Sequence, residues 1–154
     1  MPSFLRRLQF RAHVWLAARL LPVRAKRGRL DDLLRYAGAN EAIGTYRGLS
    51  VDEIIDAVRE TTSRPWRMRG RRCLREGLLA HRFLALAGFR PVLHFGISPA
   101  TVATDHPRAH CWLELDGETI LNPATEPMLD LFAYDGRDPA AVPEVLREYG
   151  EKNG

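Results

Sequence analysis

The chain has 154 residues, of which 45% are hydrophobic and 27% are charged. This composition suits one compact, soluble core and excludes a disordered chain or a collagen-like repeat. The net charge of +4 hides an uneven distribution. Residues 1–75 contain 17 Arg and Lys against 7 Asp and Glu (+10), and residues 76–154 contain 6 against 12 (−6). The basic first half and the acidic second half are therefore expected to contact different kinds of molecules.

Cysteine content and the amino terminus indicate the compartment. Cys73 and Cys111 are the only cysteines, and no Cys/His spacing is typical of zinc, so we expect no disulfide framework, no metal and no cofactor. Arg19 interrupts the first apolar stretch and no cleavage pattern follows, so a signal peptide is not expected. No apolar run reaches about 18 residues, which excludes a membrane-spanning helix. We expect a cytoplasmic protein with reduced thiols.

The amino-terminal part is predicted to be helical. Apolar residues recur every three or four positions from Phe4 to Leu21, which predicts an amphipathic helix that Pro22 ends. This helix is expected to pack onto the domain, with a partner or a membrane surface as the alternative. A solvated connector over 24–29 and a short helix over 30–37 follow. Glycines then place a soft boundary near residue 48, dividing the chain into a helical segment (1–48) and a second domain (49–154).

Two further helices are predicted on either side of a basic segment. Ser50 and Glu53 form a capping box that opens a helix over 51–63, which Pro65 stops. Six arginines then lie within residues 64–75; they could bind acidic residues of a partner, or form a solvated loop. The next stretch is apolar on all sides, which predicts a buried helix that ends at Gly88 and carries Cys73 in its first turn.

The apolar period changes to two after Gly88. Residues 92–97 and 109–115 have strand character, and Asp116-Gly117 is a tight-turn dipeptide that leads to a third strand over 119–121. Residues 143–149 could add one or two helical turns. Helices followed by a small antiparallel sheet make the fold class α+β.

Three residues in this order suit a cysteine nucleophile: Cys73, His110 and Asn122. A helix amino terminus favours a thiolate and offers N–H groups to an oxyanion. Lowering a thiol pKa by about three pH units requires roughly 4 kcal/mol, and an exposed helix end contributes only about 0.3–1 kcal/mol. His110 is therefore the expected partner of the thiolate, and Arg71, Arg72 and Arg75 would add a positive surround.

Strand alternation assigns further roles around His110. His110, Trp112 and Glu114 face one side of their strand and Cys111 faces the other, so Cys111 is assigned to the core and away from the site. Asn122 ends the hairpin that begins at His110, and its amide oxygen is expected to accept a ring N–H of His110. Asp in place of Asn122 is then expected to preserve or raise turnover.

Four residues are candidates for substrate binding. Trp66 and Arg72 belong to the basic segment, and Trp112 and Glu114 share the face of His110. Three of them have a plainer alternative: Trp66 could cover the helix over 51–63, Arg72 could be solvated, and Glu114 could be an exposed carboxylate at an edge. The other histidines lack the spacing of metal ligands.

Several segments together resemble a known family. These are Val51-Asp-Glu-Ile-Ile-Asp-Ala-Val, Arg64-Pro-Trp66, Cys73-Leu-Arg-Glu-Gly-Leu-Leu-Ala80, Gly88-Phe-Arg-Pro-Val-Leu-His-Phe-Gly-Ile97 and Ala109-His-Cys-Trp-Leu-Glu-Leu-Asp-Gly117. The chain resembles the transglutaminase-like peptidase of lasso-peptide maturation, which is the carboxy-terminal domain of the bacterial microcin-processing B proteins. The resemblance covers roughly residues 49–125. It implies a transglutaminase-like or papain-like cysteine protease core.

The resemblance also implies an activity and its partners. The protein would remove the leader from a ribosomally made precursor peptide, with Cys73 attacking the scissile carbonyl, His110 moving the proton and Asn122 orienting His110. Members of the family often have Asp at the position of Asn122. A separate leader-recognition protein and an ATP-dependent lasso cyclase would act beside it.

Two other functions remain open from the sequence. The same acyl-enzyme could pass its acyl group to an amine, which would make the protein a transglutaminase-like acyltransferase. The basic first half could instead belong to a non-enzymatic binding module for an anionic partner. The arginines are not interleaved with stacking aromatic residues and no nucleic-acid motif occurs, so we expect no nucleic-acid partner.

Overall fold

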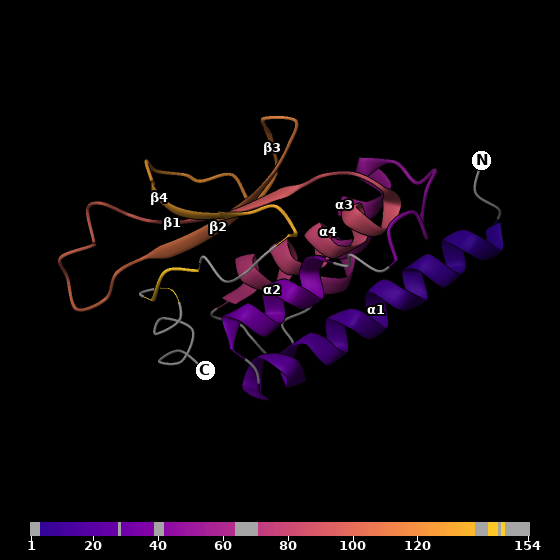
Figure 1. The fold of residues 1–154 in the computed structure, drawn as a ribbon, viewed down its shortest axis with the longest axis horizontal. Helices are drawn as coiled ribbons and strands as arrows, with labels where there is room; N and C mark the ends of the chain where they lie inside the picture. The colour runs from indigo at the N-terminus through magenta and orange to yellow at the C-terminus, as the bar shows by residue number, and fades with distance from the viewer. Residues whose placement is uncertain are drawn as a thin grey trace.

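The computed structural model describes residues 4–27, 29–38, 42–63, 71–137, 142–144 and 146. Four helices precede an antiparallel sheet of four strands in the order β3-β2-β1-β4 (Figure 1). The elements are α1 (Phe4–Arg27), α2 (Leu30–Gly38), α3 (Val51–Thr62), α4 (Arg72–Ala87), β1 (Val92–Ile97), β2 (Ala109–Leu115), β3 (Glu118–Leu121) and β4 (Leu129–Tyr134). The helices gather on one face of the sheet. This arrangement confirms the predicted α+β class.

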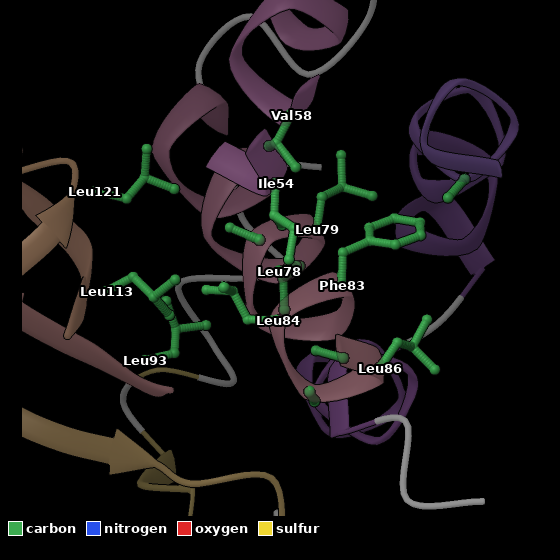
Figure 2. Close-up of a cluster of buried hydrophobic side chains, with 14 of the residues drawn as sticks. Ile54, Val58, Leu78, Leu79, Phe83, Leu84, Leu86, Leu93, Leu113 and Leu121 are labelled. Carbon is green, nitrogen blue, oxygen red and sulfur yellow. The ribbon is translucent and has the colours of Figure 1, made fainter. Parts of the chain in front are cut away.

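Helix α4 is the centre of the molecule. It contacts all three other helices and also strands β1 and β2. Leu78 and Leu84 lie on the side of the sheet residues Leu93 and Leu113, whereas Phe83 packs edge-on against a ring of α1 (Figure 2). A helix that is covered on every side must be apolar all round, as the sequence predicted. Gly88 ends α4 in a left-handed conformation with φ of 97°, also as predicted.

Helix α1 does not end at Pro22, so the prediction of its end was wrong. The helix continues to Arg27 with Pro22 inside it, and most of the expected connector over 24–29 is helical. Proline has no N–H to donate to the carbonyl of Ala18, four residues earlier. The buried guanidinium of Arg75 donates to that carbonyl instead, at 2.8 Å. A donor from α4 therefore replaces the missing helical bond.

The predicted capping box opens α3. The Ser50 hydroxyl accepts from the Glu53 N–H at 3.1 Å, and the Glu53 carboxylate accepts from the Ser50 N–H at 2.9 Å. The helix ends at Thr62, one residue before the predicted end, and Pro65 lies outside the described residues. Buried side chains of α1 and α2 join those of α3 and α4 in one core cluster. The division of the chain near residue 48 stays a prediction.

The sheet contains the three predicted strands and one that was missed. Strands β1 and β2 have the predicted bounds, and β3 begins at Glu118, after the turn at Asp116-Gly117. Strand β4 pairs with β1 along the outer edge, with an irregularity between Phe95 and Gly96. Of the expected terminal helix, the structure describes helical residues only at 144 and 146. Across the described ranges, no helix is both long and apolar enough to cross a bilayer.

Candidate active site

Cys73 occupies the first turn of α4 and is partly buried. The residue before the helix, Arg71, makes no side-chain cap, so its side chain does not occupy the first-turn N–H groups of α4. The pKa of the Cys73 thiol falls from its usual value near 9 to about 6. The largest cause is a hydrogen bond from the Cys111 thiol; the backbone N–H of Cys111, the positive charge of His110 and the N–H of Leu74 add to it, and burial opposes them. Cys73 is therefore largely a thiolate at neutral pH.

Cys111 is the unexpected member of this site. It is buried in the core as predicted, but the expectation that it stands apart from the site was wrong, because it lines the same pocket as Cys73 and His110 and its thiol lowers the pKa of Cys73. Alternation does place Cys111 on the helix side of β2, and that side holds the first turn of α4. Gly77, one turn after Cys73, permits the approach: a Cβ there would lie 2.7 Å from a Leu93 methyl and 3.6 Å from the Cys111 sulfur. The pKa of Cys111 rises well above its usual value because its thiol serves as the donor to Cys73, and burial adds to the effect.

His110 lies near the start of β2 with its ring held in one orientation. Its Nε2 is 2.8 Å from the backbone carbonyl oxygen of Asn122. A carbonyl oxygen only accepts hydrogen bonds, so Nε2 carries the proton and the Nδ1 of the neutral ring is left as a base. His110 and Cys73 line one narrow pocket together with Phe95, Gly96 and Ala109. A cysteine that forms a thiolate and an imidazole base thus line the same pocket.

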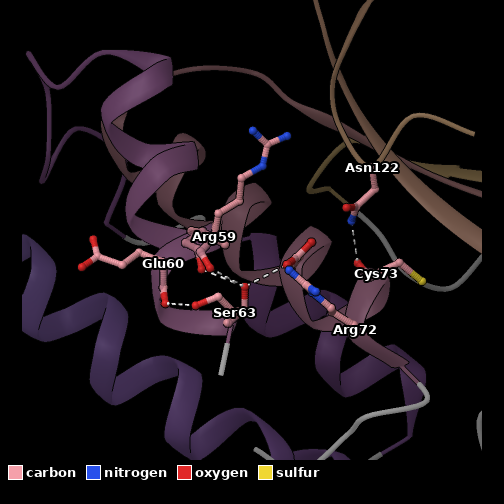
Figure 3. Close-up of polar contacts among 9 residues, drawn as sticks. Arg59, Glu60, Ser63, Arg72, Cys73 and Asn122 are labelled. Carbon is pink, nitrogen blue, oxygen red and sulfur yellow. Dashed lines mark hydrogen bonds and ion pairs between the residues drawn. The ribbon is translucent and has the colours of Figure 1, made fainter. Parts of the chain in front are cut away.

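Asn122 contributes differently from the sequence prediction. Its backbone carbonyl, and not its side-chain amide oxygen, accepts from His110. Its side chain points the other way and donates from Nδ2 to the backbone carbonyl of Cys73 at 3.2 Å (Figure 3). The residue has φ of 53°, a left-handed conformation that Asn tolerates better than most side chains. Asn122 therefore links the start of α4 to the end of the hairpin through hydrogen bonds to both Cys73 and His110.

A stacked array on the open face of the sheet supports His110. The ring of Trp112 stacks between those of His94 and His110, with centroids 5.3 and 6.4 Å away. Trp112 Nε1 donates to Glu114 at 3.0 Å, and the second oxygen of Glu114 lies 3.2 Å from His94 Nε2. Asp130 of the missed strand β4 binds the other ring nitrogen of His94 at 2.8 Å. The array braces one face of the His110 ring, and both carboxylate oxygens of Glu114 already have partners.

The predicted positive surround of Cys73 is not what lowers its pKa. Arg75 turns away to the carbonyl of Ala18, and Arg72 Nε pairs with the buried carboxylate of Glu76 at 2.9 Å. Glu76 also accepts from the Thr62 hydroxyl at 2.9 Å, so Arg72 belongs to the link between α3 and α4 (Figure 3). Substrate contacts by Arg72, Trp112 and Glu114 stay predictions. Trp66 lies outside the described residues.

Cys73 borders two hollows of different character. One is the pocket that it shares with His110, where Leu74 and Leu30 add apolar walls. The other is an open cleft between the end of α3 and the start of α4, lined by Arg59, Glu60, Ser63, Arg72, Cys73, Glu76 and Asn122. Cys73 is the residue that the two hollows have in common. Among the described residues, no group of three Cys, His, Asp or Glu side chains is arranged to hold a metal ion.

Comparison with known proteins gives one match. The family model described as the transglutaminase-like superfamily matches residues 5–132, a range that includes Cys73, His110 and Asn122. Searches of curated proteins and of solved structures find no match. The chain therefore belongs to the transglutaminase-like superfamily, whose members are generally cysteine proteases or acyltransferases.

Proposed function

We propose that this protein is a cysteine peptidase that removes the leader peptide from a lasso-peptide precursor. The observation that supports it most is the thiol of Cys73, which has a pKa of about 6 and shares a pocket with an oriented imidazole. The specific substrate class comes from the resemblance of the motifs around Cys73 and His110 to the lasso-maturation peptidases. The precursor peptide, a leader-recognition protein and an ATP-dependent cyclase are the partners that this proposal implies.

The proposed reaction uses the groups around Cys73 in two steps. The Cys73 thiolate attacks the scissile carbonyl, and uncapped N–H groups of the first turn of α4 donate to the developing oxyanion. His110, which has taken the thiol proton on Nδ1, gives it to the leaving amine, so the core peptide departs and the leader remains as a thioester. Water then attacks the thioester with His110 as base, which releases the leader carboxylate and restores the thiol.

The two hollows beside Cys73 suggest how a precursor would bind. The narrow pocket has apolar walls and suits one apolar side chain next to the scissile bond. The open cleft carries both Arg and Glu side chains and suits a polar backbone that continues away from the bond. In this arrangement Asn122 contacts the cleft through its side chain and the His110 ring through its backbone.

Reconstitution with the precursor and the recognition protein tests the proposal. Cys73→Ala and His110→Ala should each abolish cleavage, whereas His106→Ala, at an exposed histidine of the β1–β2 loop, should cleave at the wild-type rate. Undiminished cleavage by either of the first two variants would overturn the proposal. The mass of the leader product separates the two activities of the superfamily, because a free carboxylate indicates hydrolysis and an amide indicates acyl transfer.

A further inference from the structure

Helix α1 has two apolar faces, and only one of them packs into the protein. The inner face is buried in the core and consists of Phe10, Val14, Ala17, Ala18 and Leu21. Seven of the ten exposed large hydrophobic residues in the described chain lie on the same helix. Their exposed fractions are Phe4 81%, Leu5 74%, Leu8 56%, Trp15 50%, Leu16 49%, Leu20 46% and Val23 40%. Exposed apolar surface is therefore concentrated on one element.

These seven side chains are here called the outer stripe. At 3.6 residues per turn, all seven fall on the half of the helix opposite its inner face. At 1.5 Å per residue, the stripe from Leu5 to Val23 is about 27 Å long. Helix α1 runs along the edge of the molecule farthest from the sheet, with its amino terminus at one end of the longest dimension (Figure 1). The outer stripe is thus a long exposed ridge, and on its α3 side Leu8 and Trp15 border a hollow that α3 also lines.

The charge of α1 complements an anionic surface. The helix contains six arginines and one lysine and no Asp or Glu. Arg7 and Arg11 reach toward α3, where they meet Glu53 at 2.7 Å and Glu60. At the opposite edge of the stripe, Arg24 lies over the ring of Tyr36. Cationic groups therefore flank the apolar ridge on both sides.

One cation also lies within the stripe. The guanidinium of Arg19 sits over the ring of Trp15, 4.1 Å from its centroid. An indole ring beside a long cationic side chain is suited to the boundary between acyl chains and headgroups, where the ring enters the apolar layer and the cation stays at the headgroups. This pair lies near the middle of the ridge.

We propose that the outer stripe docks on an anionic lipid surface, with α1 lying in the plane of the interface. A bilayer accepts a long exposed ridge without needing a matching groove, and anionic headgroups complement a helix that has no acidic residue. The inner face of α1 stays packed in the core, so the whole domain would rest on the membrane without crossing it. This docking does not depend on the chemistry of Cys73.

Vesicle flotation with the full chain tests the proposal. Binding is expected to vesicles of phosphatidylglycerol and phosphatidylcholine, to be far weaker to phosphatidylcholine alone, and to fall about tenfold or more in high salt. Leu5→Ser with Leu8→Ser should lower the partition coefficient at least about tenfold. The pair Leu20→Ser and Val23→Ser should lower it less, because these side chains are less exposed.

Matched controls and opposing results make the test decisive. Ile43→Ser and Val102→Ser remove exposed apolar residues outside α1, with exposed fractions of 61% and 50%, and should not change binding. Circular dichroism and thermal melting should show that all variants remain folded. The proposal is overturned if the wild type fails to float, if it binds both vesicle types equally, or if the stripe variants bind like the wild type. Self-association that the stripe variants abolish, without vesicle binding, would show that a second copy covers the stripe.

Discussion

Replacing Cys111 with alanine tests how the reactive thiol is tuned. The Cys111 thiol is the largest of the influences that lower the pKa of Cys73 to about 6. The full lowering of about three pH units corresponds to roughly 4 kcal/mol. A hydrogen bond to a charged group contributes about 1.5–3 kcal/mol, so its loss should raise the pKa of Cys73 by about one to two pH units. The thiolate forms above the pKa, so the reactive range should move to higher pH.

Alkylation by iodoacetamide as a function of pH measures this change. The chain has only two cysteines, so Cys111→Ala leaves Cys73 as the one thiol and the label needs no further assignment. In the wild type, Cys73 reacts while the buried Cys111 does not, and the rate should fall as the pH drops through about 6. In Cys111→Ala the alkylation rate of Cys73 should reach half its maximum near pH 7–8 by the same arithmetic.

Cys111→Ser provides the matched control. Serine has nearly the size of cysteine and keeps a donor, so its midpoint should lie below that of the alanine variant. Thermal melts should show that both variants fold, and that Cys111→Ala melts at a modestly lower temperature because alanine fills less of the core. If alanine and serine both leave the midpoint near pH 6, the N–H groups and His110 are sufficient, and the role given to the Cys111 thiol is wrong.

Three further predictions address the elements that hold the site. Arg75→Met should lower the free energy of unfolding in urea by about 1–3 kcal/mol, because the Ala18 carbonyl loses its donor. The loss should be smaller in a Pro22→Ala background, where the N–H of residue 22 can donate to that carbonyl; equal losses in both backgrounds would contradict this account. Asn122→Asp should lower turnover, because a carboxylate cannot donate to the Cys73 carbonyl. This is the reverse of the expectation from the sequence, and a variant that cleaves at the wild-type rate or faster would contradict the role of the Asn122 side chain. Ser50→Ala should destabilise the protein by about 1 kcal/mol in chemical denaturation, and no measurable change would mean that the capping box is not stabilising.

Local patterns predicted much of the fold because their causes are local. The capping box at Ser50 and the left-handed glycine at position 88 depend on residues within one turn of the helix end. The alternation in β1 and β2 follows from burying one face of the sheet. The placement of Cys73 in the first turn of α4 followed from the same kind of pattern.

The missed features depend on residues far apart in the chain. Helix α1 passes through Pro22 because Arg75, more than fifty residues later, supplies the missing donor. Strand β4 is an edge strand whose partner, β1, lies more than thirty residues earlier. The faces of β2 were predicted correctly, but what lies on each face is a matter of tertiary packing, so the contact between Cys73 and Cys111 was not foreseen.

Acid quenching during turnover, followed by intact mass spectrometry, tests the central claim most directly. If Cys73 is the nucleophile, the quenched enzyme should carry the leader as a thioester, with a mass equal to enzyme plus leader minus water. Peptide mapping should place the adduct on Cys73, and hydroxylamine should remove it. Cleavage without any covalent adduct, or an adduct on Cys111, would contradict the account.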